Sequence, residues 1–184
     1  MELDSKATPA VSTEPTESFA GLIGKVALAI DRNLSPGDVA ALRRLDPRDP
    51  AAPAFWKVCA SWLDRTLPEE GSSRDEAERR WATILAGMAI TVGQHNPRHH
   101  AGAALAEAGF SELRFMRLLR ARGDTLSDAL RITARFLASK AVSFDWRDLA
   151  LLVLSDGRAD EEDVRRHLAR NFYQADRKST KENT

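Results

Sequence analysis

The sequence predicts an all-α protein, a two-lobed bundle of about eight helices with no sheet. Apolar residues recur at helical spacing in most segments, and the first such run comprises Phe19, Leu22, Ile23, Val26 and Ile30. All eight prolines occur at or before Pro97, so no later residue interrupts a helix by lacking a backbone N–H. The apolar run at 149–154 could be a buried strand, but it would have no partner strand, and we therefore predict a helix.

The first half of the chain is predicted to form four helices, each marked by a start or stop signal. The first runs from Phe19 to about Asn33. Ser35 precedes a proline that suits the first turn of the second helix, which ends at Asp46 and Pro47. The third helix covers 53–67 and begins with a proline. The fourth follows a Gly-Ser loop, has an acidic first turn and ends near Gly93.

The second half is predicted to form further helical segments, separated by glycines and an Asp-Gly turn. These segments cover 101–108, 111–122, 125–140, 144–155 and 160–174.

We expect two lobes, residues 16–96 and 97–173, that meet in the loop around Pro97. The segments 1–15 and 174–184 are rich in polar residues and hold too few apolar side chains to offset the entropy of ordering. We expect the first to be disordered and the second to be a flexible tail.

Composition points to a cytoplasmic protein that does not enter a membrane. No run approaches 18 apolar residues, and the N-terminus lacks both a basic start and an apolar stretch. The single cysteine, Cys59, cannot form an internal disulfide, and its apolar neighbours favour a buried thiol over a nucleophile. The 27 basic and 27 acidic residues cancel, so only local clustering of charge could indicate a nucleic-acid partner.

Such a cluster occurs in the segment 111–122. On a helix of 3.6 residues per turn, Arg114, Arg117 and Arg120 share about a third of the circumference, while Phe115 and Leu119 point elsewhere. Arg122 lies between the two groups and could complement the negative end of the helix. The segment therefore predicts a helix that packs on one side and presents positive charge on the other.

Further basic residues follow nearby, and residues 98–147 hold nine basic against five acidic side chains. The additional candidates for a nucleic-acid surface are Arg131, Arg135, Lys140, Arg43 and Arg44. We expect guanidinium groups from several helices to form one solvent-facing stripe, because arginine binds phosphate oxygens in pairs without reading base sequence. The alternative interpretation is a solvated helix face whose arginines are held by carboxylates.

No motif predicts catalysis, a cofactor or a metal. His95, His99 and His100 lie close together, but Pro97 prevents them from sharing a helical face, and a loop in contact with phosphate suits them better. The carboxylates lie mainly at predicted helix starts, where capping explains them. Trp56, Trp62 and Trp81 lie in apolar stripes and are predicted to pack in the core.

Three stretches resemble the CasB family, the small subunit of the type I-E CRISPR surveillance complex Cascade. They are AALRRLDP at 40–47, FW at 55–56, and the long run at 100–156 that contains SELRFMRLL and FDWRDLALLV. The resemblance extends from about residue 19 to 173.

The resemblance implies an all-helical, two-lobed subunit without enzymatic activity, present in two copies along the complex. Its partners would be the other Cascade subunits, the second copy, the target DNA and its displaced strand, with guide RNA nearby. Basic side chains would hold DNA while guide RNA pairs with its complement, and the four arginines at 114–122 are the first candidates for this role.

Two other functions fit the same residues. A protein-protein adaptor would use the arginines to dock acidic partner surfaces. A helix-turn-helix regulator would use 111–122 as a recognition helix and would prefer particular duplex sequences.

Overall fold

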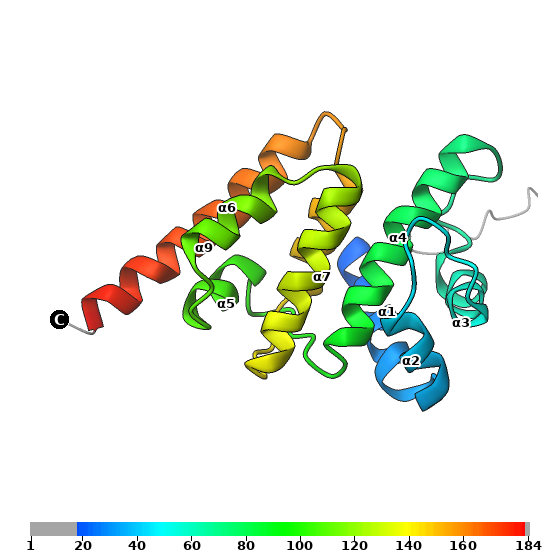
Figure 1. Ribbon diagram of the computed structural model, residues 1–184, viewed down its shortest axis with the longest axis horizontal. Coiled ribbons are helices and arrows are strands. Elements are labelled where there is room, and N and C mark those ends of the chain that lie inside the picture. Colours follow the sequence, from blue (N-terminus) through cyan, green and yellow to red (C-terminus); the bar gives the residue numbers. More distant parts are fainter. Residues whose placement is uncertain (1–17, 183–184) are drawn as a thin grey trace, which may run out of the picture.

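The computed structural model describes residues 18–182, with side chains up to Lys178, and this part of the chain folds into nine α-helices (Figure 1). The all-α prediction is confirmed, since the described residues form no strand beyond a single parallel bridge between His95 and Phe144. The helices are α1 (Phe19–Arg32), α2 (Pro36–Arg43), α3 (Pro53–Val58), α4 (Ser72–Ile90), α5 (Ala101–Glu107), α6 (Glu112–Arg120), α7 (Gly123–Ser139), α8 (Trp146–Leu154) and α9 (Glu161–Glu182).

Two of the predicted helix starts are capped by serine. The Ser18 hydroxyl accepts a hydrogen bond from Gly21 N at 3.1 Å, and the Ser35 hydroxyl accepts one from Asp38 N at 3.1 Å. Each cap satisfies a backbone donor that has no partner inside the helix. The predicted third helix differs, because α3 ends at Val58 and continues as a π-helical turn, η1 (Cys59–Leu63).

Helix α4 is the central element of the core and packs against α2, α7 and α8. Gly87 allows α8 to approach α4 closely, because a Cβ atom at this position would lie 2.5 Å from the ring of Trp146 on α8. In Figure 1, α2 and α3 lie on one side of α4, while α7 lies on the other side and α5, α6 and α9 lie beyond it.

The predicted lobes share one continuous hydrophobic core. It contains Ile23 and Phe55 from the first lobe and Leu130, Trp146 and Phe172 from the second. The position of the lobe boundary stays a prediction, and the segment 1–15 lies outside the described residues.

Helix α9 is longer than the sequence predicts. It continues through Glu182, so the segment expected as a flexible tail, 174–184, begins inside this helix. Two features explain the difference. The chain after Gly157 contains no glycine or proline to end the helix, and Ala175 is still buried. None of the described helices is both long and apolar enough to cross a membrane.

Candidate nucleic-acid interface

Helix α6 is anchored on one side by aromatic packing. Phe115 and Leu118 are fully buried, and the Phe115 ring stacks on Phe172 of α9 with 3.9 Å between ring centroids. Such burial of two large side chains fixes the rotation of a short helix about its axis. The opposite side of α6 must therefore face solvent.

Three of the four predicted arginines occupy that solvent-facing side. Arg114, Arg117 and Arg120 are exposed, and their guanidinium groups form no hydrogen bond or ion pair with any other described residue. We call these three residues the α6 arginines. Leu113 lies among them and leaves 65% of its surface exposed. Their charge is thus available to an external partner.

The only carboxylate on α6 is held by α9. Glu112 Oε1 accepts a hydrogen bond from the Tyr173 hydroxyl at 2.9 Å, and this interaction raises the pKa of Tyr173. Sequence reasoning did not find this pair, because 61 residues separate its members. The α6 arginines therefore lack the local carboxylate partner that the alternative interpretation requires.

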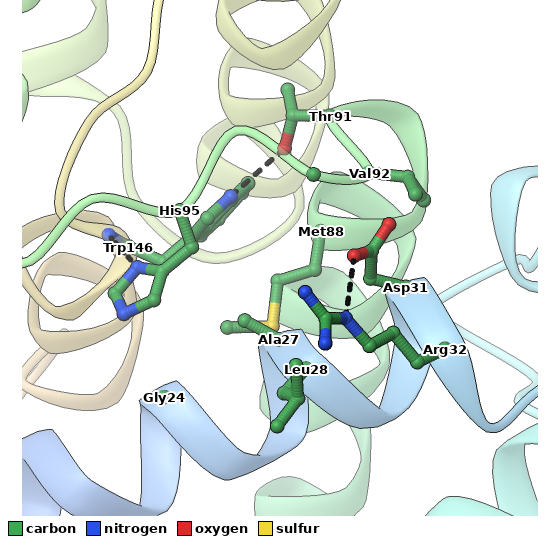
Figure 2. A pocket seen from close by; sticks show the side chains of 11 residues that line it. Gly24, Ala27, Leu28, Asp31, Arg32, Met88, Thr91, Val92, His95 and Trp146 are labelled. Atoms are coloured by element: carbon green, nitrogen blue, oxygen red, sulfur yellow. Dashed lines mark hydrogen bonds and ion pairs between the residues drawn. The ribbon is translucent and has the colours of Figure 1, made fainter.

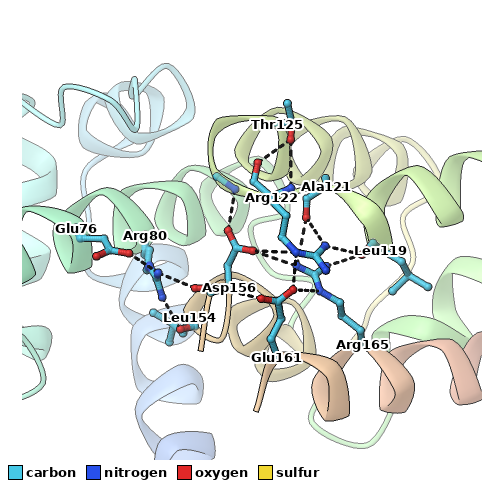
Figure 3. A network of polar contacts seen from close by, with 12 residues as sticks. Glu76, Arg80, Leu119, Ala121, Arg122, Thr125, Leu154, Asp156, Glu161 and Arg165 are labelled. Atoms are coloured by element: carbon cyan, nitrogen blue, oxygen red, sulfur yellow. Dashed lines mark hydrogen bonds and ion pairs between the residues drawn. The ribbon is translucent and has the colours of Figure 1, made fainter. Parts of the chain in front are cut away.

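Arg122 is also exposed, with 46% of its side chain accessible, but its guanidinium takes part in a polar network (Figure 3). Its guanidinium pairs with Glu161 and, at 3.6 Å, with Asp156, and its Nη1 donates to the carbonyl oxygens of Leu119 and Ala121. The two carbonyls close the C-terminal end of α6, so Arg122 does complement that negative end, as the sequence predicts.

A second arginine completes the same network from α9. Arg165 is only 5% exposed, and it donates to Leu119 O at 2.6 Å, Glu161 Oε1 at 3.0 Å and Asp156 Oδ1 at 3.1 Å. Its four-residue spacing from Glu161 is a helical ion-pair pattern, but nothing in the sequence shows that the pair is buried. The network ties the end of α6 to the start of α9 and so positions the α6 arginines.

Two other candidates also serve the fold. Arg131 on α7 donates to Arg43 O at 2.8 Å and to Leu45 O at 2.5 Å, where α2 ends. Arg43 donates in turn from Nε to Ala89 O on α4 at 2.7 Å. Both guanidiniums bind backbone carbonyls that would otherwise lack donors, so they hold α2, α4 and α7 together.

The remaining candidates, Arg44, Arg135 and Lys140, are exposed, as Arg43 and Arg122 are. Arg44 and Arg135 have no side-chain partner among the described residues, and the Lys140 ammonium lies 5.9 Å from the centroid of the Phe136 ring. Arg135 lies one turn after Arg131, which faces α2. We call Arg44 and Arg135 the α2–α7 arginines.

The candidate guanidiniums without a partner lie on α6, directly after α2 and on α7, and the single stripe expected from the sequence stays a prediction. In Figure 1, α6 and α2 lie on opposite sides of α7. Asp124 and Asp128, at the start of α7, pair with Arg48 at 2.9 and 3.8 Å.

A pocket of about 350 Å³ lies between α1, the end of α4 and the start of α8 (Figure 2). Polar side chains that line the pocket form hydrogen bonds or ion pairs with one another or with the backbone. Trp146 donates from Nε1 to Thr91 Oγ1 at 2.8 Å, and its backbone N–H donates to His95 Nδ1 at 3.3 Å. Burial lowers the pKa of His95, so the imidazole is neutral at pH 7.

The two other loop histidines are also engaged. His99 contacts Ser143 O at 2.8 Å through Nδ1 and Glu107 Oε2 at 3.0 Å through Nε2. His100 contacts Asp148 Oδ2 at 3.1 Å, a His-Asp pair that sequence reasoning missed because its members are 48 residues apart.

The chain matches the model of a known protein family. The family model described as CRISPR-associated protein Cse2 matches residues 38–173. Among curated proteins, none matches the chain.

Two solved structures share the fold. A chain of E. coli Cascade bound to a PAM-containing double-stranded DNA target is 22% identical, with a TM-score of 0.60 over 84% of this chain and 96% of that one. A chain of a CRISPR RNA-guided surveillance complex is 21% identical, with a TM-score of 0.63 over 89% of this chain and 95% of that one.

Proposed function

Because the chain belongs to the Cse2 family of CRISPR-associated proteins, which confirms the predicted CasB relationship, we propose that it is a non-catalytic, DNA-holding subunit of a Cascade complex. The shared fold of the Cascade chains supports this assembly. The partners would be the other Cascade subunits, a second copy of the chain, the target DNA and the displaced strand, with guide RNA nearby.

The observation that carries the proposal is the state of the α6 arginines. They are exposed, unpaired among the described residues, and mounted on a helix that Phe115 and Leu118 fix to the core. A guanidinium group on a fixed helix can bind two phosphate oxygens without first breaking an internal ion pair. These contacts contribute affinity but do not discriminate between base sequences.

The energetics of strand exchange explain why a few such contacts suffice. A guide RNA–DNA hybrid is about as stable as the DNA duplex that it replaces, so the exchange is nearly balanced. Contacts with the sugar-phosphate backbone can therefore shift the equilibrium toward the open state. We place the α6 arginines in this role and assign the α2–α7 arginines, with Lys140, to a second contact region.

The other candidate residues act indirectly in this proposal. Their guanidinium groups bind carbonyls and carboxylates within the protein, as seen for Arg122, Arg131 and Arg43. Their contribution to DNA binding is to hold the helices that present the free arginines.

One observation favours the adaptor function. Leu113 is a large apolar residue exposed at the centre of the α6 arginines, and an apolar centre with a charged rim is typical of protein-protein interfaces. In that case the arginines would dock an acidic protein surface.

Charge reversal tests the proposal. We expect the triple variant Arg114→Glu, Arg117→Glu, Arg120→Glu to lose binding of labelled single-stranded DNA in a retardation assay at moderate salt, with unchanged circular dichroism. The matched control reverses three exposed arginines elsewhere, Arg32, Arg79 and Arg98, and should keep most of the affinity.

The assay also separates the alternatives. Unchanged retardation of DNA by the α6 triple variant would contradict the proposal and leave the adaptor. A strong preference of the unaltered protein for one duplex sequence would instead support the helix-turn-helix regulator.

A further inference from the structure

Two histidines and a carboxylate converge where α5, α8 and α9 meet. His100 immediately precedes α5, Asp148 lies on α8 and His167 lies on α9. One ligand atom from each residue lies within 4.8 Å of the other two. The three residues are far apart in sequence and are brought together only by the fold.

We propose that His100, Asp148 and His167 form a binding site for one divalent transition-metal ion of the zinc class. The chemistry of the donors selects this class. Imidazole nitrogens suit Zn²⁺, Ni²⁺, Co²⁺ and Cu²⁺, whereas Mg²⁺ and Ca²⁺ prefer sites built from oxygen atoms.

The carboxylate supplies the first argument for an ion. The Asp148 side chain is only 3% exposed, and its Oδ2 accepts hydrogen bonds from Ala101 N at 3.0 Å and from His100 Nδ1 at 3.1 Å. Its Oδ1 forms a long ion pair with Arg147 Nη2 at 3.8 Å, which is too far for a hydrogen bond. The charge of a buried carboxylate is costly without close partners, and a metal ion would add a closer cation.

The two imidazoles supply the second argument. Their ring centroids lie 5.2 Å apart with the planes at 81°, so the rings are not stacked on each other. The Asn171 amide nitrogen contacts His167 Nε2 at 3.0 Å and restrains that ring. His167 is exposed and His100 is partly exposed, so an ion can enter from solvent.

The spacing requires only a small adjustment on binding. Tetrahedral Zn²⁺ with bonds of 2.0–2.1 Å separates its ligand atoms by about 3.3 Å, so the cluster has to contract by at most about 1.5 Å. Rotation of the exposed His167 side chain can supply this movement. The bound ion would join α9 to α5 and α8, and water would complete its coordination.

The inference does not depend on DNA binding and is tested with the metal alone. The full chain, free of any tag and treated with chelator, is titrated with ZnCl₂ in a calorimeter. We expect one equivalent to bind and the melting temperature to rise. His167→Ala, at an exposed position that the fold tolerates, should weaken the affinity at least about tenfold, and His100→Ala should do the same.

The control is His99→Ala, which removes a neighbouring imidazole outside the cluster and should leave Zn²⁺ affinity within about twofold. Co²⁺ in place of Zn²⁺ should give a visible absorption spectrum that disappears in His167→Ala. Three results would overturn the proposal: no Zn²⁺ binding at micromolar concentration, equal affinity in His167→Ala, or equally tight binding of Mg²⁺. Asp148 would then only anchor the start of α5 by hydrogen bonds.

Discussion

Replacement of Arg165 by leucine tests how the α6 arginines are held in place. Arg165 is 5% exposed and forms four hydrogen bonds, to the carbonyls of Leu119 and Ala121 and to the carboxylates of Glu161 and Asp156. Removing one partner of a buried ion pair costs about 3–5 kcal/mol, because the remaining charge is left uncompensated.

The surrounding network sets the size of the effect within that range. Arg122 contacts the same two carbonyls and the same two carboxylates, so it continues to serve all four acceptors in the variant (Figure 3). We therefore expect a loss near the lower limit, about 3 kcal/mol. For a chain of this length, that loss lowers the melting temperature by about 6–12 °C.

Thermal unfolding followed by circular dichroism measures this change, and Arg166→Leu is the matched control. Arg166 lies next to Arg165 on α9 but is 66% exposed, and its pairs with Glu162 and Asp163 are on the surface. Exposed pairs contribute about 0–1 kcal/mol, so the control should change stability little. If Arg165→Leu costs less than about 1 kcal/mol, or no more than Arg166→Leu, the reasoning about the network is wrong.

Three further predictions concern the core. Gly102→Ala should cost about 2–3 kcal/mol in urea unfolding, because the new Cβ would lie 2.4 Å from Leu168 O and push α9 away from α5; an unchanged urea midpoint would contradict this packing. Burial raises the pKa of Cys59 to about 12, so Ellman's reagent should label the thiol at pH 8 only after unfolding, and rapid labelling of the native protein would show that it is accessible. Burial lowers the pKa of His95 below its usual 6.5. As the pH falls, the His95 imidazole therefore binds a proton in the unfolded state before it does so in the native state. The stability contributed by neutral His95 is lost as the pH falls below about 6.5. Melting temperatures at pH 7 and pH 5.5 should therefore differ less in His95→Gln than in the unaltered protein, and an equal difference would refute the assignment.

Local signals in the sequence predict much of the fold. Ser18 and Ser35 cap helices where a serine precedes an apolar or proline-led run. The glycines after α5 and α6 separate the predicted segments, because Gly109 and Gly123 adopt positive φ. The end of α9 is missed, since composition suggests a disordered tail while Ala175 packs against the rest of the protein.

The candidate site depends more on contacts that no local pattern contains. Arg120 and Arg122 are two residues apart and look equivalent in sequence, but only Arg122 reaches the acids of the loop before α9 and its first turn. The same holds for Glu112, which is held by Tyr173, and for His100, which meets Asp148 and His167. Such pairings between distant segments arise only when the helices pack.

The central claim is that the α6 arginines bind phosphate directly and that Arg122 does not. The salt dependence of affinity for single-stranded DNA, measured by fluorescence anisotropy, tests it, because each phosphate contact adds about 0.7 to the slope of log affinity against log salt. Three contacts from α6 predict a contribution of about −2 to that slope. Arg114→Ala, Arg117→Ala and Arg120→Ala should each make the slope shallower by about 0.7, while Arg122→Ala should leave it unchanged. Slopes that stay the same in the α6 variants, or that change most in Arg122→Ala, would contradict the account.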